Sequence, residues 1–278
     1  MSTAARRQNA GSIVITAIAV VISLIGLTPI IWFLFVSIQR EGTPIRSVLD
    51  WFRPPYTFSN YRQIIFNSRV PGWMLNSLFI SSASTFLTVL LSALAAYPLA
   101  KIDFYGRGKF YFYFLLGLLV PGEATIVPLF IVANSLGLID SYAGMILPGI
   151  AGSMNLIIMV TFFRGIPQEL IEVCHLDGAR EFTIFSRVML PLSKTVLVTV
   201  SIFAFIGNWN SFLWPLLCAM SQRMFTLTVG IPTLMDTYTV DYTIPATANM
   251  VASIPAIIVF LIFERQITQG IAMSGIKG

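Results

Sequence analysis

The side chains of this chain that could do chemistry are few and scattered. There is one histidine, His175, and there are two cysteines, Cys174 and Cys218. An enzyme would need a nucleophile beside a base, or a cluster of metal ligands, and the sequence suggests neither. A phosphate loop for ATP is also missing, because the nearest string, Gly106–Phe110, lacks the glycine spacing and the final hydroxyl. We therefore expect no catalytic residue, no metal and no cofactor on this chain.

Four other side chains could instead line a path for a solute. Glu123 is the one ionisable residue well inside a predicted membrane span. Asn208, Trp209 and Asn210 set amides beside an aromatic face, a combination typical of sugar sites. Asn208 and Asn210 cannot face the same direction on one helix. Hydrogen bonds between helices for the asparagines, and a capped or interfacial position for Glu123, remain the alternatives.

Membrane-spanning helices must position these residues. The chain is 56% hydrophobic and 10% charged, whereas soluble proteins carry roughly 25% charged residues. A spanning helix needs about 20 apolar residues. Six segments qualify: Ile13–Ile38, Trp73–Ala100, Phe110–Asn134, Gly144–Phe163, Thr195–Leu217 and Asn249–Phe263, of which the last could begin a few residues earlier. We expect an all-α bundle of six transmembrane helices that forms one domain over residues 1–278.

Prolines and charges add detail to these spans. Prolines are expected to bend several of them, and the break at Pro121-Gly122 beside Glu123 is the strongest candidate for a hinge or a pathway. The first span follows Arg6 and Arg7, but it is too long for a signal peptide and no cleavage site follows, so we expect it to be retained.

The basic residues predict the orientation of the spans. With both termini in the cytoplasm, the inner segments hold 11 Lys and Arg residues and the outer segments hold 6, which agrees with the positive-inside rule. These residues lie in short spacers rather than along one stripe, so the net charge of +5 does not indicate nucleic-acid binding. The two cysteines fall on opposite sides, and we expect no disulfide. The long first outer loop is expected to fold over the outer surface with its aromatics near the lipid headgroups; its marked residues are Trp51, Pro54, Pro55, Tyr56 and Trp73.

The segment between the fourth and fifth spans, at about residues 165–194, is predicted to form two short helices. Gly178 suits a left-handed helix end, and Glu172 lies near the positive start of the first helix. Helices of this length are unstable alone in water, and an apolar face on one needs a groove. Apolar residues recur at helical spacing in both: Leu170, Val173 and Leu176, then Phe182, Phe185 and Met189. The groove could belong to the chain's own bundle or to a partner protein.

The order of residues in this loop resembles the EAA loop of permease subunits from binding-protein-dependent ABC importers. The pattern E-A-A-x-x-D-G-A-x-x-x-x-x-F-x-x-x-x-L-P is matched by Glu172, Asp177-Gly178-Ala179, Phe185 and Leu190-Pro191, with Val173 and Cys174 in place of the two alanines. The resemblance extends over nearly the whole chain, to the smaller of the two paired subunits of the maltose-importer type. Further matching strings are Asn76-Ser77, Val120-Pro121, Pro128-Leu129-Phe130, Leu136-Gly137-Leu138, Ile146-Leu147-Pro148, Trp209-Asn210, Leu213-Trp214-Pro215 and Gly275-Ile276-Lys277-Gly278.

This resemblance implies the transmembrane subunit of an ATP-driven importer for a sugar or related solute in the plasma (inner) membrane of a prokaryote, surrounded by lipid. A second homologous permease subunit would complete the path, a dimer of ATP-binding subunits would bind ATP, and an extracytoplasmic solute-binding protein would deliver the solute. The loop would dock on the ATPase through Glu172, Leu176, Asp177, Gly178, Ala179, Phe182 and Phe185.

Two other classes stay open as alternatives. A secondary, ion-coupled transporter would relay protons through intramembrane carboxylates or histidines. Glu123 is a single such group, which is little for a proton relay. An intramembrane enzyme would need the catalytic groups that the spans lack. The solute itself could be a sugar, a polyol or a glycerol phosphodiester.

Overall fold

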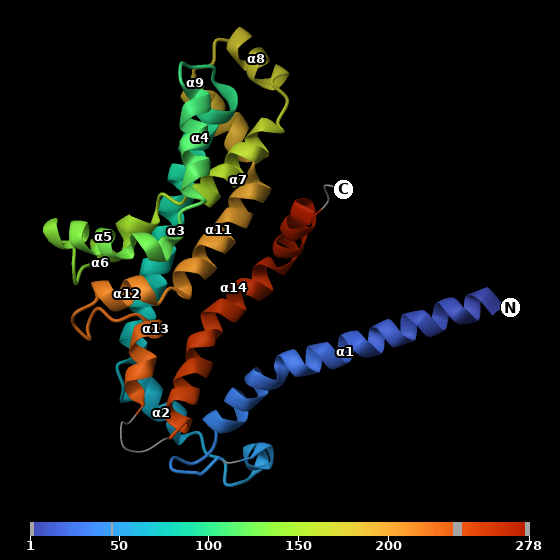
Figure 1. Cartoon of the computed structure of the whole chain (residues 1–278), viewed down its shortest axis with the longest axis vertical. Coiled ribbons are helices and arrows are strands. Elements are labelled where there is room, and N and C mark those ends of the chain that lie inside the picture. The colour runs from blue at the N-terminus through green and yellow to red at the C-terminus, as the bar shows by residue number, and fades with distance from the viewer. Residues whose placement is uncertain (1–2, 46, 236–240, 276–278) are drawn as a thin grey trace. The chain divides into compact units, whose positions relative to one another are not determined.

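The computed structural model describes the backbone of residues 3–45, 47–235 and 241–275, and side chains within residues 15–264 of these ranges (Figure 1). Within this described part the chain is helical, and its one β-type contact is an isolated bridge between Gln39 and Tyr56. The chain divides into two compact units. The first contains Met1–Pro71 with Ile231–Ser253, and the second contains Gly72–Gly230 with Ile254–Gly278.

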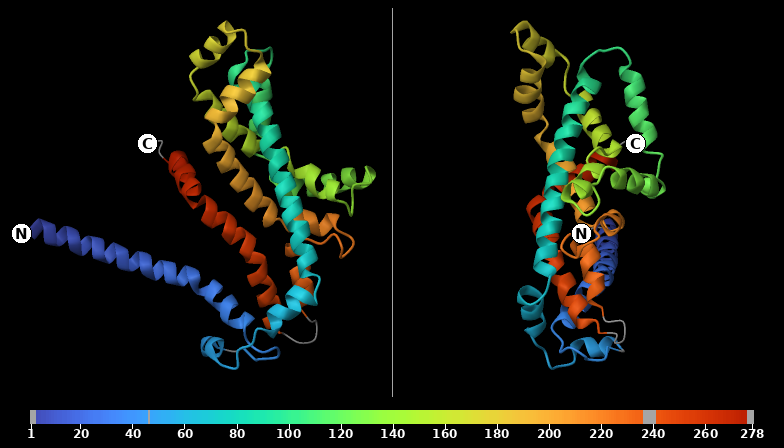
Figure 2. Two further views of the ribbon diagram at one scale, coloured as in Figure 1. Left: turned by 180° about the vertical axis from the view of Figure 1, so that it is seen from behind. Right: turned by 90° about the vertical axis from the view of Figure 1, so that its left-hand side faces the viewer.

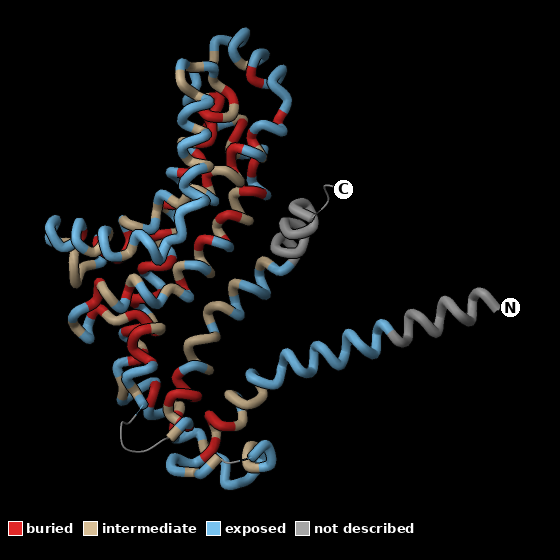
Figure 3. Tube along the Cα trace, viewed as in Figure 1, coloured by how far each residue is buried: buried red, intermediate tan, exposed pale blue. Residues whose placement is uncertain are grey.

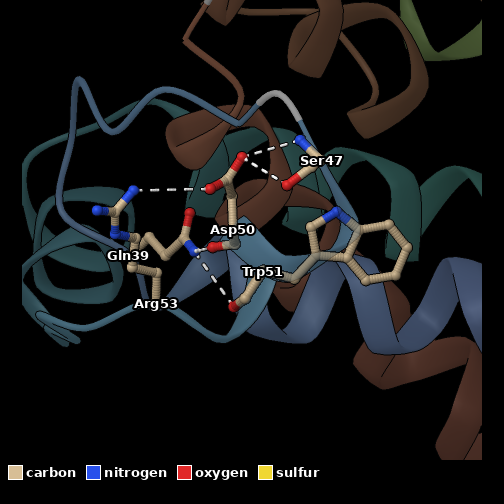
Figure 4. Close-up of polar contacts among 5 residues, drawn as sticks. All are labelled: Gln39, Ser47, Asp50, Trp51 and Arg53. Carbon is tan, nitrogen blue, oxygen red and sulfur yellow. Dashed lines mark hydrogen bonds and ion pairs between the residues drawn. The ribbon is translucent and has the colours of Figure 1, made fainter.

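The first unit is built around a folded loop that follows a long apolar helix. Its elements are α1 (Thr3–Ser37), η1 (Val48–Phe52), α2 (Ser59–Phe66), η4 (Ile231–Leu234) and the start of α14 (Thr243–Gly275). Gln39 is fully buried and donates from Nε2 to the carbonyl oxygens of Asp50 at 2.5 Å and Trp51 at 3.2 Å (Figure 4). Asn60 donates to the carbonyls of Ser37 and Gln39, at 3.1 and 2.7 Å. These buried bonds give the predicted outer loop a defined fold.

The second unit holds the remaining helices. They are α3 (Val70–Lys101, whose first two residues belong to the first unit), α4 (Arg107–Gly117), α5 (Gly122–Ser135), α6 (Tyr142–Ile146), η2 (Leu147–Gly149), α7 (Ser153–Arg164), α8 (Glu169–Leu176), α9 (Glu181–Ile184), the π-helical turn η3 (Phe185–Met189), α10 (Leu190–Leu192), α11 (Lys194–Trp209), α12 (Leu213–Cys218), α13 (Leu227–Gly230) and the end of α14. In this unit α3, α4, α7 and α11 run side by side (Figures 1 and 2).

The second unit has two apolar cores. The larger lies where α3, α7 and α11 meet, and its fully buried members include Ala96, Met159, Phe163, Met189 and Val200. The smaller joins Ile80 of α3 to α6 and to the end of α12, through Met145 and Cys218. Figure 3 shows the buried residues lining the inner faces of these helices and the exposed residues facing outward. Apolar side chains on the outer faces are expected where lipid or another subunit replaces water.

Three helices are long and apolar enough to cross a membrane unbroken: Ile15–Ser37, Val70–Lys101 and Thr243–Glu264. Three more spans result if each bent helix pair crosses as one, which gives up to six. The sixth predicted span does begin earlier than Asn249, at Thr243. The expectation of a polytopic all-α bundle is therefore confirmed, but half of its spans are broken.

The predicted third, fourth and fifth spans are interrupted, as expected for spans that contain prolines. The third bends by 101° between α4 and α5, at Pro121, which lacks an N–H and forces the residue before it out of the helical conformation. The fourth bends by 47° between the segments Tyr142–Gly149 and Ser153–Arg164. The fifth ends at Trp209 instead of Leu217, because the ring of Pro215 would clash with the carbonyl of residue 211 in a continuing helix.

Candidate functional site

The loop at about residues 165–194 is organised by a glycine turn after α8. Gly178 has φ +76°, in the left-handed region that the sequence predicts. Its N–H donates to the carbonyl of His175 at 2.9 Å, and the N–H of Ala179 donates to the carbonyl of Cys174 at 3.0 Å. This pair of bonds is the Schellman ending of a helix. A Cβ at Gly178 would meet nothing within 4 Å, so a side chain there would strain only the backbone of this chain.

One side of the loop is fastened to the bundle by apolar burial. Ile171 of α8, Ile184 of α9 and Met189 of the π-helical turn are fully buried, and Phe185 of the same turn is buried as well. All four belong to the core that contains Phe163 and Tyr97. Of the seven residues expected to dock on a partner, Phe185 thus lies inside this chain, where its ring packs 5.6 Å from that of Tyr97.

The other side of the loop is open. Leu176 is 87% exposed and Phe182 is 72% exposed, on either side of the glycine turn. The described residues of this chain leave the apolar stripe of α8 uncovered, because Leu170 and Val173 are exposed as well. Glu172, Asp177 and Gly178 are exposed beside it, and Ala179 is half-buried. Figure 3 shows α8 as the outermost helix at this end of the unit, largely in the colour of exposed residues.

Two residues of α3 that hold this loop were missed in the sequence. Tyr97 donates from its hydroxyl to Oε2 of Glu181 at 2.6 Å, and Lys101 donates from Nζ to the carbonyl of Ile166. In the sequence, Lys101 was used only to predict the orientation of the second span, and Tyr97 only added to the hydropathy of that span. A signal was available, since a tyrosine and a lysine lie one turn apart at the end of an apolar span.

The four candidates for the translocation path do not come together. Glu123 is exposed in the first turn of α5. Trp209 is buried and stacks on Phe205 at a centroid distance of 5.7 Å, and Asn210 is exposed at the end of α11. Asn208 is half-buried, donates from Nδ2 to the carbonyl of Ala204 at 2.7 Å, and lines a pocket. Of the four candidates, Asn208 is the one that lines this pocket.

The pocket beside Asn208 has a volume of about 170 Å³ and lies inside the second unit. Its walls come from α3, α5, α6 with η2, the end of α11, α12 and the loop before α13: Ile80, Ser81, Leu129, Met145, Pro148, Gly149, Asn208, Ser211, Trp214, Pro215 and Thr226. Trp214 donates from Nε1 to the carbonyl of Gly144 at 3.0 Å, which fixes its ring in the wall. The hydroxyls of Ser81, Ser211 and Thr226 were missed in the sequence, because single hydroxyl residues in apolar segments form no pattern.

Two polar residues at the start of α3 position the loop that closes this region. Asn76 donates from Nδ2 to the carbonyls of Arg223 and Phe225, at 2.7 and 2.9 Å. The hydroxyl of Ser77 accepts from the N–H of Leu227 at 2.8 Å. The Asn76-Ser77 string therefore has a structural role.

Trp73 corrects one expectation for the outer loop. It was expected near the lipid headgroups, but it is 4% exposed and donates from Nε1 to the carbonyl of Gln222 at 2.9 Å. Its ring lies so close to Gly230 that a Cβ there would overlap it. The indole therefore packs inside the protein, because a glycine on the facing segment leaves room for it.

Asp140 joins the segment after α5 to the segment after α12. It takes φ +58°, and its carboxylate accepts from the N–H groups of Met220 and Ser221, both at 2.9 Å, and from the Ser221 hydroxyl at 3.0 Å. Its own N–H donates to the carbonyl of Cys218 at 2.7 Å. The hydrogen bonds from Ser221, with that from Met220, hold the pKa of Asp140 below its usual value.

Comparison with known proteins identifies the family. The model of the family described as "Binding-protein-dependent transport system inner membrane component" matches residues 88–273. The chain belongs to this family. The match includes the glycine turn, the loop around it and every residue that lines the pocket except Ile80 and Ser81, so most of these features lie in the part that the family shares. The terminal string Gly275-Ile276-Lys277-Gly278 falls beyond the matched residues, and residues 276–278 lie outside the described ones.

Related transport permeases match over almost the whole chain. The arabinooligosaccharides transport system permease protein AraQ of Bacillus subtilis is 34% identical over 270 residues, which is 96% of each chain. The trehalose transport system permease protein SugB of Mycobacterium tuberculosis is 32% identical, over 91% of this chain and 93% of its own. The diacetylchitobiose uptake system permease protein NgcG of Streptomyces coelicolor is 30% identical, over 92% and 86%.

A solved structure has the same fold. It is a chain of a bacterial ABC transporter involved in the import of the acidic polysaccharide alginate, and it superposes with a TM-score of 0.85 at 22% identity, covering 95% of this chain and 98% of its own. This binding-protein-dependent permease thus has the ABC importer permease fold that the EAA-like loop implied. Neither an ion-coupled transporter nor an intramembrane enzyme is supported.

Proposed function

We propose that this binding-protein-dependent permease forms half of the translocation path of an ATP-driven importer for a sugar or sugar-like solute, and that residues 165–194 couple it to a separate ATPase. The relatives described above are named as permeases for arabinooligosaccharides, trehalose and diacetylchitobiose, which supports a carbohydrate as solute. The proposed assembly has a second homologous permease subunit, a dimer of ATP-binding subunits and an extracytoplasmic solute-binding protein. Both termini lie in the cytoplasm, as the basic residues indicate.

One observation carries the coupling role: the uncovered apolar face around the glycine turn. Leu176 and Phe182 are among the more exposed large apolar side chains of the chain, at 87% and 72%. In the proposed orientation the loop is outside the bilayer, so lipid does not cover them. Short amphipathic helices of this kind bind in grooves of partner proteins. Glu172, Asp177, Gly178 and Ala179 would contact the ATPase beside them, and buried Phe185 would hold the loop from behind.

The pocket beside Asn208 supports a path for a hydroxyl-rich solute. Since Nδ2 of Asn208 already donates to Ala204, its Oδ1 is the atom left to accept from a solute hydroxyl. Ser81, Ser211 and Thr226 add hydroxyls, and Trp214 adds an indole ring. Few polar groups in a mainly apolar wall are typical of small-molecule sites. We infer that Glu123, Trp209 and Asn210 act outside this pocket, where the second permease subunit would complete the path.

The test compares two glycines that share a backbone geometry. Gly137 ends α5 in the same Schellman arrangement as Gly178, with φ +67°, and a Cβ at either position meets nothing within 4 Å. Gly178→Asp and Gly137→Asp should therefore carry the same strain, about 1–2 kcal/mol. We expect both variants to insert into the membrane. Gly178→Asp should lose co-purification with the ATPase subunits or lose uptake of radiolabelled di- and oligosaccharides, whereas Gly137→Asp should keep both.

A normal transport rate with a retained ATPase in Gly178→Asp would refute the coupling role of the loop. The purified chain alone should hydrolyse no ATP, because its sequence has no phosphate loop. Hydrolysis by the chain alone would contradict the proposed separation of permease and ATPase.

A further inference from the structure

The carboxyl-terminal end of α3 contacts the coupling loop at two polar points. We propose that Tyr97 and Lys101 form an anchor that transmits displacement of the coupling loop into α3, the second span; the inference rests on the coupling role proposed above. They are four positions apart in the sequence, so they lie one turn apart on the same face of α3. Lys101 contacts the loop before α8, and Tyr97 contacts the loop after α8.

The first point is at the entry to the loop. Lys101 is 9% exposed, and its Nζ donates to the carbonyl oxygen of Ile166, between α7 and α8. The carboxylate of Glu169, at the start of α8, attracts the same ammonium group. A buried ammonium group is costly to leave without a partner, so the hydrogen bond to Ile166 is held tightly.

The second point is beyond the glycine turn. Tyr97 is 5% exposed and donates to Oε2 of Glu181, the first residue of α9, at 2.6 Å. The other carboxylate oxygen, Oε1, lies 3.4 Å from Nε2 of His175 in the last turn of α8. Glu181 therefore connects three helices, α3, α8 and α9. The His175–Glu181 contact is weak by itself because both side chains are almost half exposed, at 45% and 48%. The shielded bond from Tyr97 is the stronger link.

These polar contacts resist sliding of the loop against the bundle, which the apolar packing behind the loop does not. Ile171, Ile184, Phe185 and Met189 bury the loop against the bundle and would hold it without any hydrogen bond. Apolar contacts tolerate sliding, however, whereas a short hydrogen bond to a carboxylate is lost with a small displacement. With α8 fastened to α3 on both of its sides, movement of α8 carries the end of α3 with it. The same helix supplies Ile80 and Ser81 to the pocket, which lies toward its other end.

The experiment measures how the accessibility of α3 changes where this helix lines the pocket, and it can be done without knowing the solute. In the assembled importer, Ser81→Cys is introduced into a chain with Cys174→Ala and Cys218→Ala, which are the two native cysteines. The labelling rate of the new thiol by a small methanethiosulfonate reagent is measured with and without ATP and vanadate. We expect the nucleotide to change this rate. Tyr97→Phe should shrink the change by about tenfold, the factor expected for one hydrogen bond to a charged group, while ATP hydrolysis and co-purification of the ATPase stay normal.

Tyr111→Phe is the matched control. Tyr111 lies on α4 against the same core, and its ring, rather than its hydroxyl, contacts Arg164 at 4.2 Å. This variant should respond to nucleotide like the parent. Glu181→Ala should act like Tyr97→Phe, and the double variant should lose no more than Glu181→Ala alone, because both substitutions remove the Tyr97–Glu181 bond. Lys101→Gln should reduce the response through the other point.

The outcomes separate the anchor from the coupling role. If Tyr97→Phe responds to nucleotide like Tyr111→Phe while Gly178→Asp does not respond, the anchor is refuted and the coupling role stands. If Gly178→Asp responds normally, the proposed function of the loop fails first. Loss of ATPase binding in Tyr97→Phe would show a purely structural role and would also overturn the anchor. Should that variant fail to insert, Glu181→Ala, at a partly exposed site, decides the same question.

Discussion

At the scale of one residue, the addition of a single Cβ atom at Gly144 is expected to destabilise the protein. Gly144 lies on α6, where a Cβ would overlap the carbonyl oxygen of Leu138 and approach Sγ of Cys218 to 3.1 Å. Because the obstacle is backbone, Gly144→Ala should lower the free energy of unfolding by about 2 kcal/mol or more. Gly207→Ala is the control, since a Cβ there meets nothing within 4 Å inside α11. Thermal unfolding of the purified protein in detergent measures both, and equal melting temperatures would contradict the close approach.

Gly178 and Lys101 show which residue roles a sequence reveals. The glycine was predicted in the left-handed conformation because a helix ending depends on neighbours within a few residues. The lysine was placed only on one side of the membrane, because its acceptor is 65 residues away, on the carbonyl of Ile166. A role that depends on a distant backbone atom leaves no local pattern.

At the scale of elements, Asp140 ties the segment after α5 to the end of α12. Asp140→Asn tolerates the same left-handed conformation but loses the charge that accepts three hydrogen bonds. We expect a loss of about 1 kcal/mol at pH 7. The pKa of this carboxyl is lowered in the folded protein, so its stabilisation is fully present above its unfolded pKa of about 3.9 and is lost as the pH falls through the lower, folded value.

The two proteins should therefore differ equally in melting temperature between pH 5 and 8 and converge at acid pH, where the carboxyl of Asp140 becomes protonated in the folded protein. Asp103→Asn serves as control, because the side chain of Asp103 is almost fully exposed and its contact with Arg107, at 4.0 Å, is a surface ion pair. A difference for Asp140→Asn that stays constant down to acid pH would show that the charge is not what joins these segments.

The breaks in the helices show what hydropathy alone does not predict. Hydropathy predicted where apolar residues cross, but it did not predict that α4 and α5 meet at 101° or that α11 stops at Trp209. Pro121 and Pro215 marked both positions in the sequence. A proline can either kink a helix or end it, and the surrounding packing decides between the two.

At the scale of the whole molecule, the orientation in the membrane is the prediction to check. Gln222→Cys and Leu176→Cys, each in a chain without native cysteines, place a thiol at exposed sites in the predicted outer and inner segments. With a membrane-impermeant maleimide, Gln222→Cys should be labelled in intact cells and Leu176→Cys only after permeabilisation. The positive-inside distribution of Lys and Arg is the reason. The reverse result would invert the proposed topology and remove the loop from the side of the ATPase.

The sequence by itself determined the membrane class, the all-α fold, the family and the glycine turn of the coupling loop. The class and the fold depend on composition and apolar periodicity, the glycine turn depends on residues within about one helical turn, and the family depends on a residue pattern that is read along the chain. Tertiary structure alone decided that Phe185 is buried while Phe182 is exposed, and that Asn208 lines a pocket without Trp209 or Asn210. It also decided that Tyr97 meets Glu181 across 84 residues and that Asn76 meets Phe225 across 149. Such contacts arise when apolar helices pack, and packing selects faces and partners that no local pattern encodes.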